Sequence, residues 1–117
     1  MNTETLADLV VNTLDELKGV DVRVIDVRDK TSITDVLVIT NGTSERHVRA
    51  LADRVAERVK EAGVKPLGVE GGRGGDWMLV DLGDVVVHVM SREKRDFYNL
   101  EKLWSMDAGG SAAGGSA

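Results

Sequence analysis

The spacing of apolar and polar residues along the chain predicts two long amphipathic helices. In residues 5–17, and again in residues 45–62, apolar side chains recur every three or four positions, so each segment has one apolar face. Thr3 is the predicted cap of the first helix. Gly19 and Gly63 follow the last apolar positions of the two patterns and are expected to end the helices.

A continuous apolar run at residues 36–39 has a different pattern, because its side chains do not alternate with polar ones. Such a run is typical of a strand that is buried on both faces. We therefore expect residues 36–40 to form the central strand of a sheet, with helices covering both of its sides.

Other apolar runs predict the remaining strands. Residues 20–27 alternate between apolar and charged side chains, and residues 67–70 form a short strand after the second helix. Residues 76–90 are typical of a hairpin, with its turn at Leu82-Gly83-Asp84. The strand, helix and strand between residues 36 and 70 predict a right-handed crossover between parallel strands.

The order of these elements is helix, two strands, helix, three strands and a short polar helix. It predicts an α/β fold with a mixed five-stranded sheet and helices packed on it. Residues 1–104 are expected to form one domain. Residues 105–117 are rich in Gly, Ala and Ser and are expected to be disordered, because they bury too little apolar surface to offset the entropy of ordering.

Composition and charge narrow the class of partner. The chain of 117 residues has a net charge of −5 and no cysteine, and its basic residues are interleaved with acidic ones. Nucleic-acid binders usually carry a basic stripe, so direct DNA or RNA binding is disfavoured and a basic protein partner is favoured. We see no signal peptide and no apolar run long enough to cross a membrane, so we expect a cytoplasmic protein without membrane contact.

All four aromatic residues lie between residues 77 and 104. Aromatic side chains often anchor protein interfaces, although they also complete aliphatic cores. The first residue of the hairpin and the segment beyond the last strand can converge at one end of the sheet. The surface expected there, which we call the partner surface, consists of Asp76, Trp77, Asp96, Tyr98, Asn99, Leu100, Glu101 and Lys102.

Two glycine-containing segments are candidates for phosphate binding. The loop at residues 71–75 precedes a strand and not a helix N-terminus, so a mobile turn is the preferred interpretation. The turn Gly42-Thr43-Ser44 lies between a strand and a helix, and it resembles the Gly-Ser start of nucleotidyltransferase enzymes.

Those enzymes also need paired carboxylates that hold two magnesium ions. Here the following strand carries only Glu70, and Asp81 and Asp84 flank a turn and do not point together. Capping of the second helix by Thr43 or Ser44 is therefore the preferred role of the turn.

The two histidines give no metal site, because neither has a second ligand at a suitable spacing. His47 is predicted at the surface, on the first turn of the second helix. His88 lies in an apolar strand and is expected to be either a histidine whose hydrogen bonds are satisfied within the fold or one at the boundary between helix and sheet. No catalytic residue, metal or cofactor is predicted.

The sequence closely resembles the ribosomal silencing factor family, also called the Iojap-like family. The resemblance covers nearly all of residues 4–104 in order, and the chain departs from the family pattern at Gly72 and in its tail. The most specific matching segments are Gly75-Asp76-Trp77, Gly83-Asp84-Val85-Val86-Val87-His88 and Tyr98-Asn99-Leu100-Glu101-Lys102-Leu103-Trp104.

The resemblance implies a nucleotidyltransferase-like core without catalytic carboxylates. It also implies a factor that binds the large ribosomal subunit through its ribosomal protein fourteen, blocks joining of the small subunit and represses translation, chiefly when nutrients are limiting. Family members are known as homodimers when free. The alternative is a nucleotidyltransferase-like, nucleotide-binding enzyme that uses the turn Gly42-Thr43-Ser44.

Overall fold

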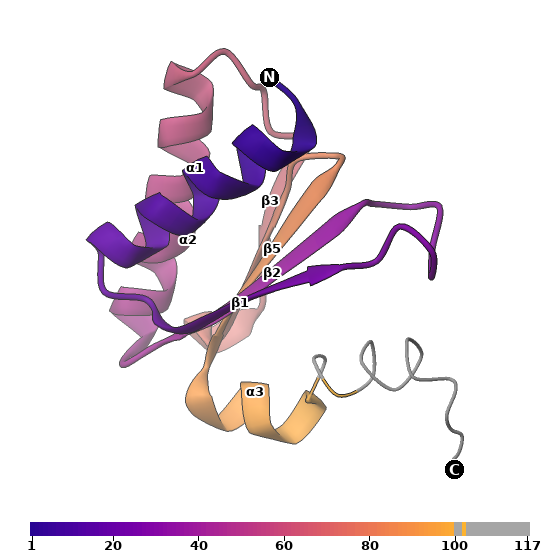
Figure 1. Ribbon diagram of the computed structural model, residues 1–117. Helices are drawn as coiled ribbons and strands as arrows, with labels where there is room; N and C mark the ends of the chain where they lie inside the picture. The colour runs from indigo at the N-terminus through magenta and orange to yellow at the C-terminus, as the bar shows by residue number, and fades with distance from the viewer. Residues whose placement is uncertain (100–101, 103–117) are drawn as a thin grey trace, which may run out of the picture.

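A computed structural model describes residues 1–99 and residue 102 of the chain, and its framework is one twisted sheet with helices beside it (Figure 1). In chain order the elements are α1 (Thr3–Glu16), β1 (Val20–Asp26), β2 (Val36–Gly42), α2 (Glu45–Glu61), β3 (Gly68–Gly71), the 3₁₀ turn η1 (Arg73–Gly75), β4 (Trp77–Asp81), β5 (Val85–Ser91) and α3 (Arg92–Tyr98). The end of the predicted domain and the predicted disordered tail lie outside the described residues.

The sheet has five strands in the order β1-β2-β5-β4-β3. β2 and β5 pair in parallel, whereas β1 with β2, β5 with β4, and β4 with β3 pair antiparallel. The predicted mixed five-stranded α/β sheet is therefore confirmed. β3 runs parallel to β2, as the predicted crossover requires, but β5 and β4 lie between them.

The expected central place of residues 36–40 is wrong by one position. β2 is buried along its whole length and is paired on both sides, but the middle strand of the sheet is β5. The hairpin of β4 and β5 inserts β5 between β2 and β4, an arrangement that nothing in the local pattern of β2 encodes.

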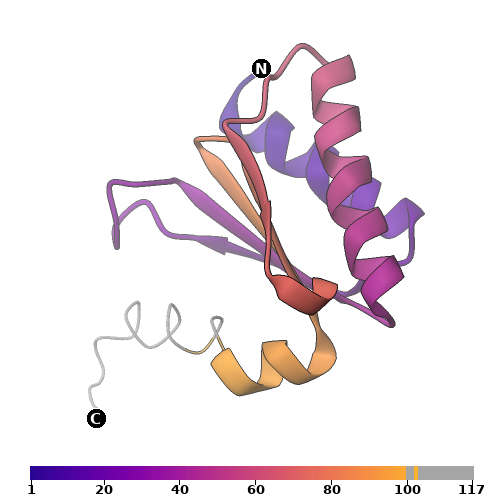
Figure 2. The same ribbon diagram turned by 180° about the vertical axis from the view of Figure 1, so that it is seen from behind.

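The expectation of helices over both faces of the sheet is also wrong. Figures 1 and 2 show α1 and α2 on the same face, and α3 lies at the end of the sheet, in contact with β5 and β2. The apolar run of β2 reflects its interior place between two strands and not a helix on each side.

The main core lies between the sheet and the two long helices. One apolar face of each helix packs on alternate residues of the inner strands, which explains the three- and four-residue spacing of α1 and α2 and the burial of every second side chain in β5. The fully buried members of this core are Val10, Leu14, Val38, Val48, Leu51, Ala52, Val55, Val59, Val80, Val85, Val87 and Val89.

Local signals decide where the first helix starts and ends. α1 begins two residues earlier than predicted, because the side chain of Asn2, and not that of Thr3, accepts a hydrogen bond from the Thr5 amide (2.8 Å). At the other end the Gly19 amide donates to the Leu14 carbonyl (2.7 Å). A side chain at Gly19 would put its Cβ 2.9 Å from Thr40 Oγ1, so a glycine is needed there for close packing.

The remaining local predictions concern turns. The hairpin turn has Gly83 at φ 88°, as a tight connection between antiparallel strands requires. In the loop expected to be a mobile turn, residues 71–75, Gly71 ends β3 and Arg73–Gly75 form η1, with Gly75 buried against Arg49 of α2. A Cβ at Gly75 would lie 2.8 Å from an Arg49 nitrogen.

Burial of Val38 gives a direct test of the fold. Val38→Asp should lower the free energy of unfolding by about 3–5 kcal/mol, because it places an unpaired carboxylate in a core position that is 0 % exposed. Val24→Asp is the matched control, since Val24 pairs with Val38 in register but is 52 % exposed on the edge strand. Equal circular-dichroism melting curves for the two variants would contradict the placement of β2.

Candidate protein-binding surface

The structure brings the start of β4 next to the start of α3. Trp77 pairs in register with Met90, one residue before the end of β5. The Ser91 amide donates to the Asp76 carbonyl (2.8 Å), and the Ser91 side chain caps α3 by accepting from the Lys94 amide (3.1 Å). The start of β4 therefore meets the start of α3 at one end of the sheet. The predicted convergence of Trp77 with residues 98–102 stays a prediction, because part of that segment lies outside the described residues.

Trp77 contributes to the fold and to the surface at once. Its indole Nε1 donates to His88 Nδ1 (3.1 Å), and the two rings lie 6.0 Å apart with a tilt of 52°. The ring is half-buried and lines a shallow groove of about 310 Å³ with Leu79, Glu70 and the backbone of residues 71–72. The polar atom of Trp77 is therefore satisfied within the fold, while part of its ring reaches the surface, and its role as an interface anchor stays a prediction.

His88 is the satisfied histidine that the sequence predicts. Because its Nδ1 accepts the proton of the Trp77 indole, the neutral ring carries its own proton on Nε2. Burial disfavours the charged form and lowers the pKa of His88 from 6.5 to about 4. The ring is therefore neutral near pH 7 and acts as a fixed acceptor that orients Trp77.

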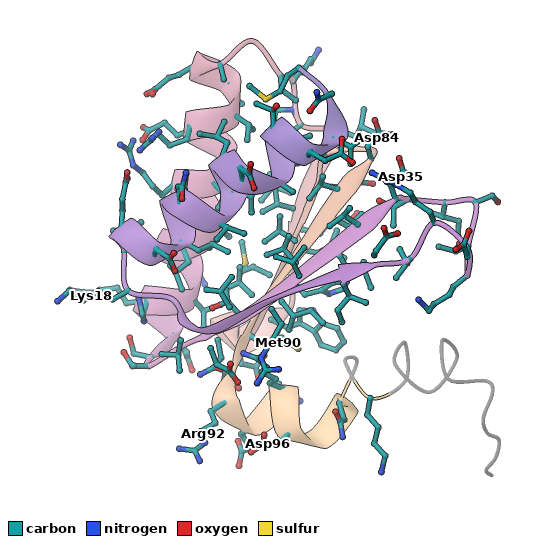
Figure 3. The ribbon with its side chains drawn as sticks, in the orientation of Figure 1. Lys18, Asp35, Asp84, Met90, Arg92 and Asp96 are labelled. Atoms are coloured by element: carbon teal, nitrogen blue, oxygen red, sulfur yellow. The ribbon has the colours of Figure 1, made fainter. Side chains whose placement is uncertain are left out.

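Charged residues of the partner surface lie on both flanks of α3. A carboxylate oxygen of Asp76 lies 3.9 Å from Lys94 Nζ, which links β4 to the helix. Asp96 is exposed and points away from the sheet (Figure 3). It lines a cleft on the β1 side of α3 and does not lie next to Trp77.

The segment after α3 is only partly described. Asn99 ends the helix in a left-handed conformation (φ 50°), and its backbone carbonyl and side-chain oxygen both accept from the Lys102 amide (3.1 and 3.3 Å). Asn99 and Lys102 are exposed. Leu100, Glu101 and the side chain of Tyr98 lie outside the described residues.

One residue at this end of the sheet was missed by the sequence analysis. Arg95 of α3 is only 6 % exposed, and its Nη1 donates to Asn41 Oδ1 (2.9 Å) and to the Val20 carbonyl (3.2 Å). Its partners lie 54 and 75 residues earlier in the chain. No local pattern distinguishes such an arginine from a solvated one.

The turn Gly42-Thr43-Ser44 uses its polar groups within the fold. Ser44 caps α2 by accepting from the His47 amide (3.1 Å), as predicted, and the Thr43 amide donates to His47 Nδ1 (2.9 Å). His47 Nε2 must then carry the ring proton, which it donates to the Leu17 carbonyl (2.7 Å). His47 is half-buried and joins α2 to the end of α1, so its predicted surface role is wrong.

The carboxylates that a nucleotidyltransferase would need are not gathered at this turn. β2 and β5 run in parallel from Val36 and Val85 to Gly42 and Ser91, so Asp84 lies at the opposite end of the sheet (Figure 3). Glu70 lies on the far edge strand β3. In residues 1–99 and 102, no three His, Cys, Asp or Glu side chains are grouped so that they could hold a metal ion.

Among the described helices, none combines the length and the apolar character that crossing a membrane requires. Taken together, the described residues form a small α/β domain. One end of its mixed sheet carries a half-buried tryptophan, a short capped helix and several charged side chains.

Comparisons with known proteins agree on one family. The family described as "Ribosomal silencing factor during starvation" matches residues 1–113. The chain is 48% identical to a Haemophilus influenzae protein named "Ribosomal silencing factor RsfS" over 86% of this chain and 98% of that protein. This protein therefore belongs to the ribosomal silencing factor family, as the sequence resemblance indicated.

Two further comparisons extend the match. A crystal structure of a Chromobacterium violaceum protein superposes with a TM-score of 0.87 at 42% identity, covering 90% of this chain and 88% of that one. A mouse protein named "Mitochondrial assembly of ribosomal large subunit protein 1" is 35% identical over 85% of this chain and 45% of that protein.

The buried His88 predicts a specific loss of stability in weak acid. Below pH 6.5 the unfolded chain binds a proton at this position that the folded chain does not bind until about pH 4. The free energy of unfolding that neutral His88 contributes above pH 6.5 is therefore lost as the pH falls. The loss is about 2 kcal/mol between pH 6.5 and pH 5. Urea unfolding at several pH values between 7.5 and 5 measures this loss.

His88→Gln is the matched variant, because glutamine can accept the indole hydrogen bond but does not titrate. Its free energy of unfolding should depend less on pH over the same interval, with His47 unchanged in both proteins. Parallel pH profiles for wild type and variant would show that His88 is not the cause.

Proposed function

We propose that this protein binds the large ribosomal subunit through its ribosomal protein fourteen and so blocks joining of the small subunit. The effect is repression of translation, chiefly when nutrients are limiting. Family membership supports a role in ribosomal silencing, and the name of the mouse relative, which refers to assembly of the large subunit, supports the choice of subunit. The observation that supports the proposal is that Asp76, the residue before Trp77, joins the start of β4 to the start of α3 at one end of the sheet.

The partner surface has the composition expected of a protein interface. An aromatic side chain, Trp77, is rigidly held by its hydrogen bond to His88, so little conformational entropy is lost when a partner covers it. Asp76 precedes Trp77 and supplies charge beside it, whereas Asp96 supplies charge on the other flank of α3. Tyr98 and Leu100 are the further apolar members of the proposed surface. An apolar centre with a charged rim is the usual anatomy of such surfaces.

The charge distribution favours a basic protein over ribosomal RNA. Two half-buried arginines of α2 are paired with carboxylates: Arg54 bonds Glu57 on the same helix, and Arg58 lies 2.7 Å from Glu16 of α1. Paired side chains of this kind do not form the basic stripe that a phosphate backbone requires. The net charge of −5 instead complements a basic ribosomal protein.

We further propose that the free protein is a homodimer, that it acts in the cytoplasm and that it works without a cofactor. Binding to the ribosome then competes with formation of the homodimer. Size-exclusion chromatography with light scattering, with and without large subunits, tests this part of the proposal separately.

Truncation of the aromatic side chains tests the proposed docking site. Trp77→Ala and Tyr98→Ala should each weaken binding to purified large subunits by about 2–4 kcal/mol, the range of interface hot spots. Melting curves are recorded in parallel, because loss of the Trp77–His88 hydrogen bond also lowers stability. Ile33→Ala is the control, since Ile33 is an exposed apolar residue (85 %) in the connection between β1 and β2. Folded aromatic variants that still bind and still block subunit joining would place the docking site elsewhere.

Reversal of charge tests the electrostatic part of the proposal. Glu101→Lys should slow association with the large subunit more than it speeds dissociation, and added salt should reduce the difference from wild type. Glu61→Lys makes the same change at an exposed position at the end of α2 and should leave both rates unchanged. Equal association rates for all three proteins would contradict the electrostatic role.

A further inference from the structure

We propose that Arg95 is a positioning residue that fixes the direction of α3 and of the chain that follows it. Its buried guanidinium ties the helix to the end of the β1–β2 pair. In this way it sets where Asn99 and Lys102 lie relative to the sheet. The inference rests on the proposed function, because it concerns the same partner surface.

The contacts of Arg95 come from two strands. Nη1 donates to Asn41 Oδ1 of β2 (2.9 Å) and to the Val20 carbonyl of β1 (3.2 Å), and Nη2 lies 3.6 Å from an oxygen of Asp21. Hydrogen bonds of a planar guanidinium are directional, and a buried charge without partners is costly. Few orientations of α3 satisfy all of these groups at once.

The start of β1 is shaped to receive this side chain. The register of β1 on β2 shifts between Val20 and Arg23, and Asp21 within this irregularity has a positive φ of 48°. Irregularities of this kind redirect side chains and carbonyls at the edge of a sheet. The Val20 carbonyl also accepts from Thr40 Oγ1 (2.8 Å), so it joins the two strands to the helix.

α3 depends on such anchors because it is short. Helices of seven residues are unstable in isolation, so tertiary contacts and caps determine whether and how they form. A cleft of about 560 Å³ separates part of α3 from the β1–β2 edge, and Arg95 reaches across this polar gap. The Ser91 cap and the Asp76–Lys94 ion pair also anchor α3.

The exit of the chain is coupled to Arg95 directly. The Asn99 amide donates to the Arg95 carbonyl (2.8 Å), and Asn99 then accepts from the Lys102 amide. A tilt of α3 at Arg95 therefore moves this turn as well. Because binding sites lose affinity when supporting residues leave them loosely held, the orientation of α3 affects affinity without any contact between Arg95 and the partner.

The test separates positioning from general stability. Arg95→Gln removes the charge and the fork of donors, and Arg95→Lys keeps the charge but not the planar fork. Arg92→Gln is the matched control, because Arg92 is exposed on the same helix and points away from the sheet (Figure 3). The melting temperature is measured for all three variants. Their affinity for the large subunit is then measured at a temperature where each variant is folded.

A second readout does not involve the ribosome. Since the chain has no cysteine, Lys102→Cys and Glu57→Cys can be spin-labelled together to measure the distance distribution between α2 and the segment after α3. We expect a narrow distribution in the wild-type background and in Arg92→Gln. Arg95→Gln should broaden it and weaken large-subunit binding by roughly tenfold or more.

Arg95→Lys carries the decisive comparison. If Arg95 positions α3, lysine should restore more of the melting temperature than of the affinity, and the distribution should stay broad. Equal recovery of stability and affinity, or a narrow distribution in both Arg95 variants, would overturn the inference. If the wild-type protein failed to bind large subunits, the proposed function would fail, whereas the distance distributions would still decide whether Arg95 orients the segment.

Discussion

The parallel pairing of β2 with β5 is the constraint on which the rest of the structure depends. It runs in register from Val36 and Val85 to Gly42 and Ser91. Because both strands end at the same edge, the helices that follow them, α2 and α3, start side by side there. The hairpin turn at Gly83 is thereby held at the opposite end. One pairing thus separates the end of the sheet that carries the partner surface from the end that carries the turn.

Burial of polar groups has a consistent role at the end of the sheet where α3 starts. His88 accepts a hydrogen bond from the indole of Trp77. Arg95 donates to the Val20 carbonyl of β1 and to the side-chain oxygen of Asn41 in β2. Such groups are costly to leave unpaired, so each restricts the geometry of the segment that carries it. Exposed ion pairs such as Arg58 with Glu16 contribute much less, because water and salt screen them. Trp77 and α3 are therefore each held by buried polar contacts.

The same arrangement accounts for the absence of a nucleotidyltransferase-like site at the turn after β2 in the described residues. The amide of Thr43 and the hydroxyl of Ser44 serve His47 and the start of α2. Carboxylates that a metal-dependent transferase would need lie at the other end of the sheet or on its far edge.

The sequence by itself determined the elements that local periodicity and turn chemistry control: α1, α2, the hairpin around Gly83 and the Ser44 cap. It also carried the motifs of the family. Only the tertiary structure decided that β5 is the middle strand, that both long helices share one face and that Arg95 is buried. The physical reason is that these features rest on contacts between segments far apart in the chain, and a residue's own neighbours do not encode them.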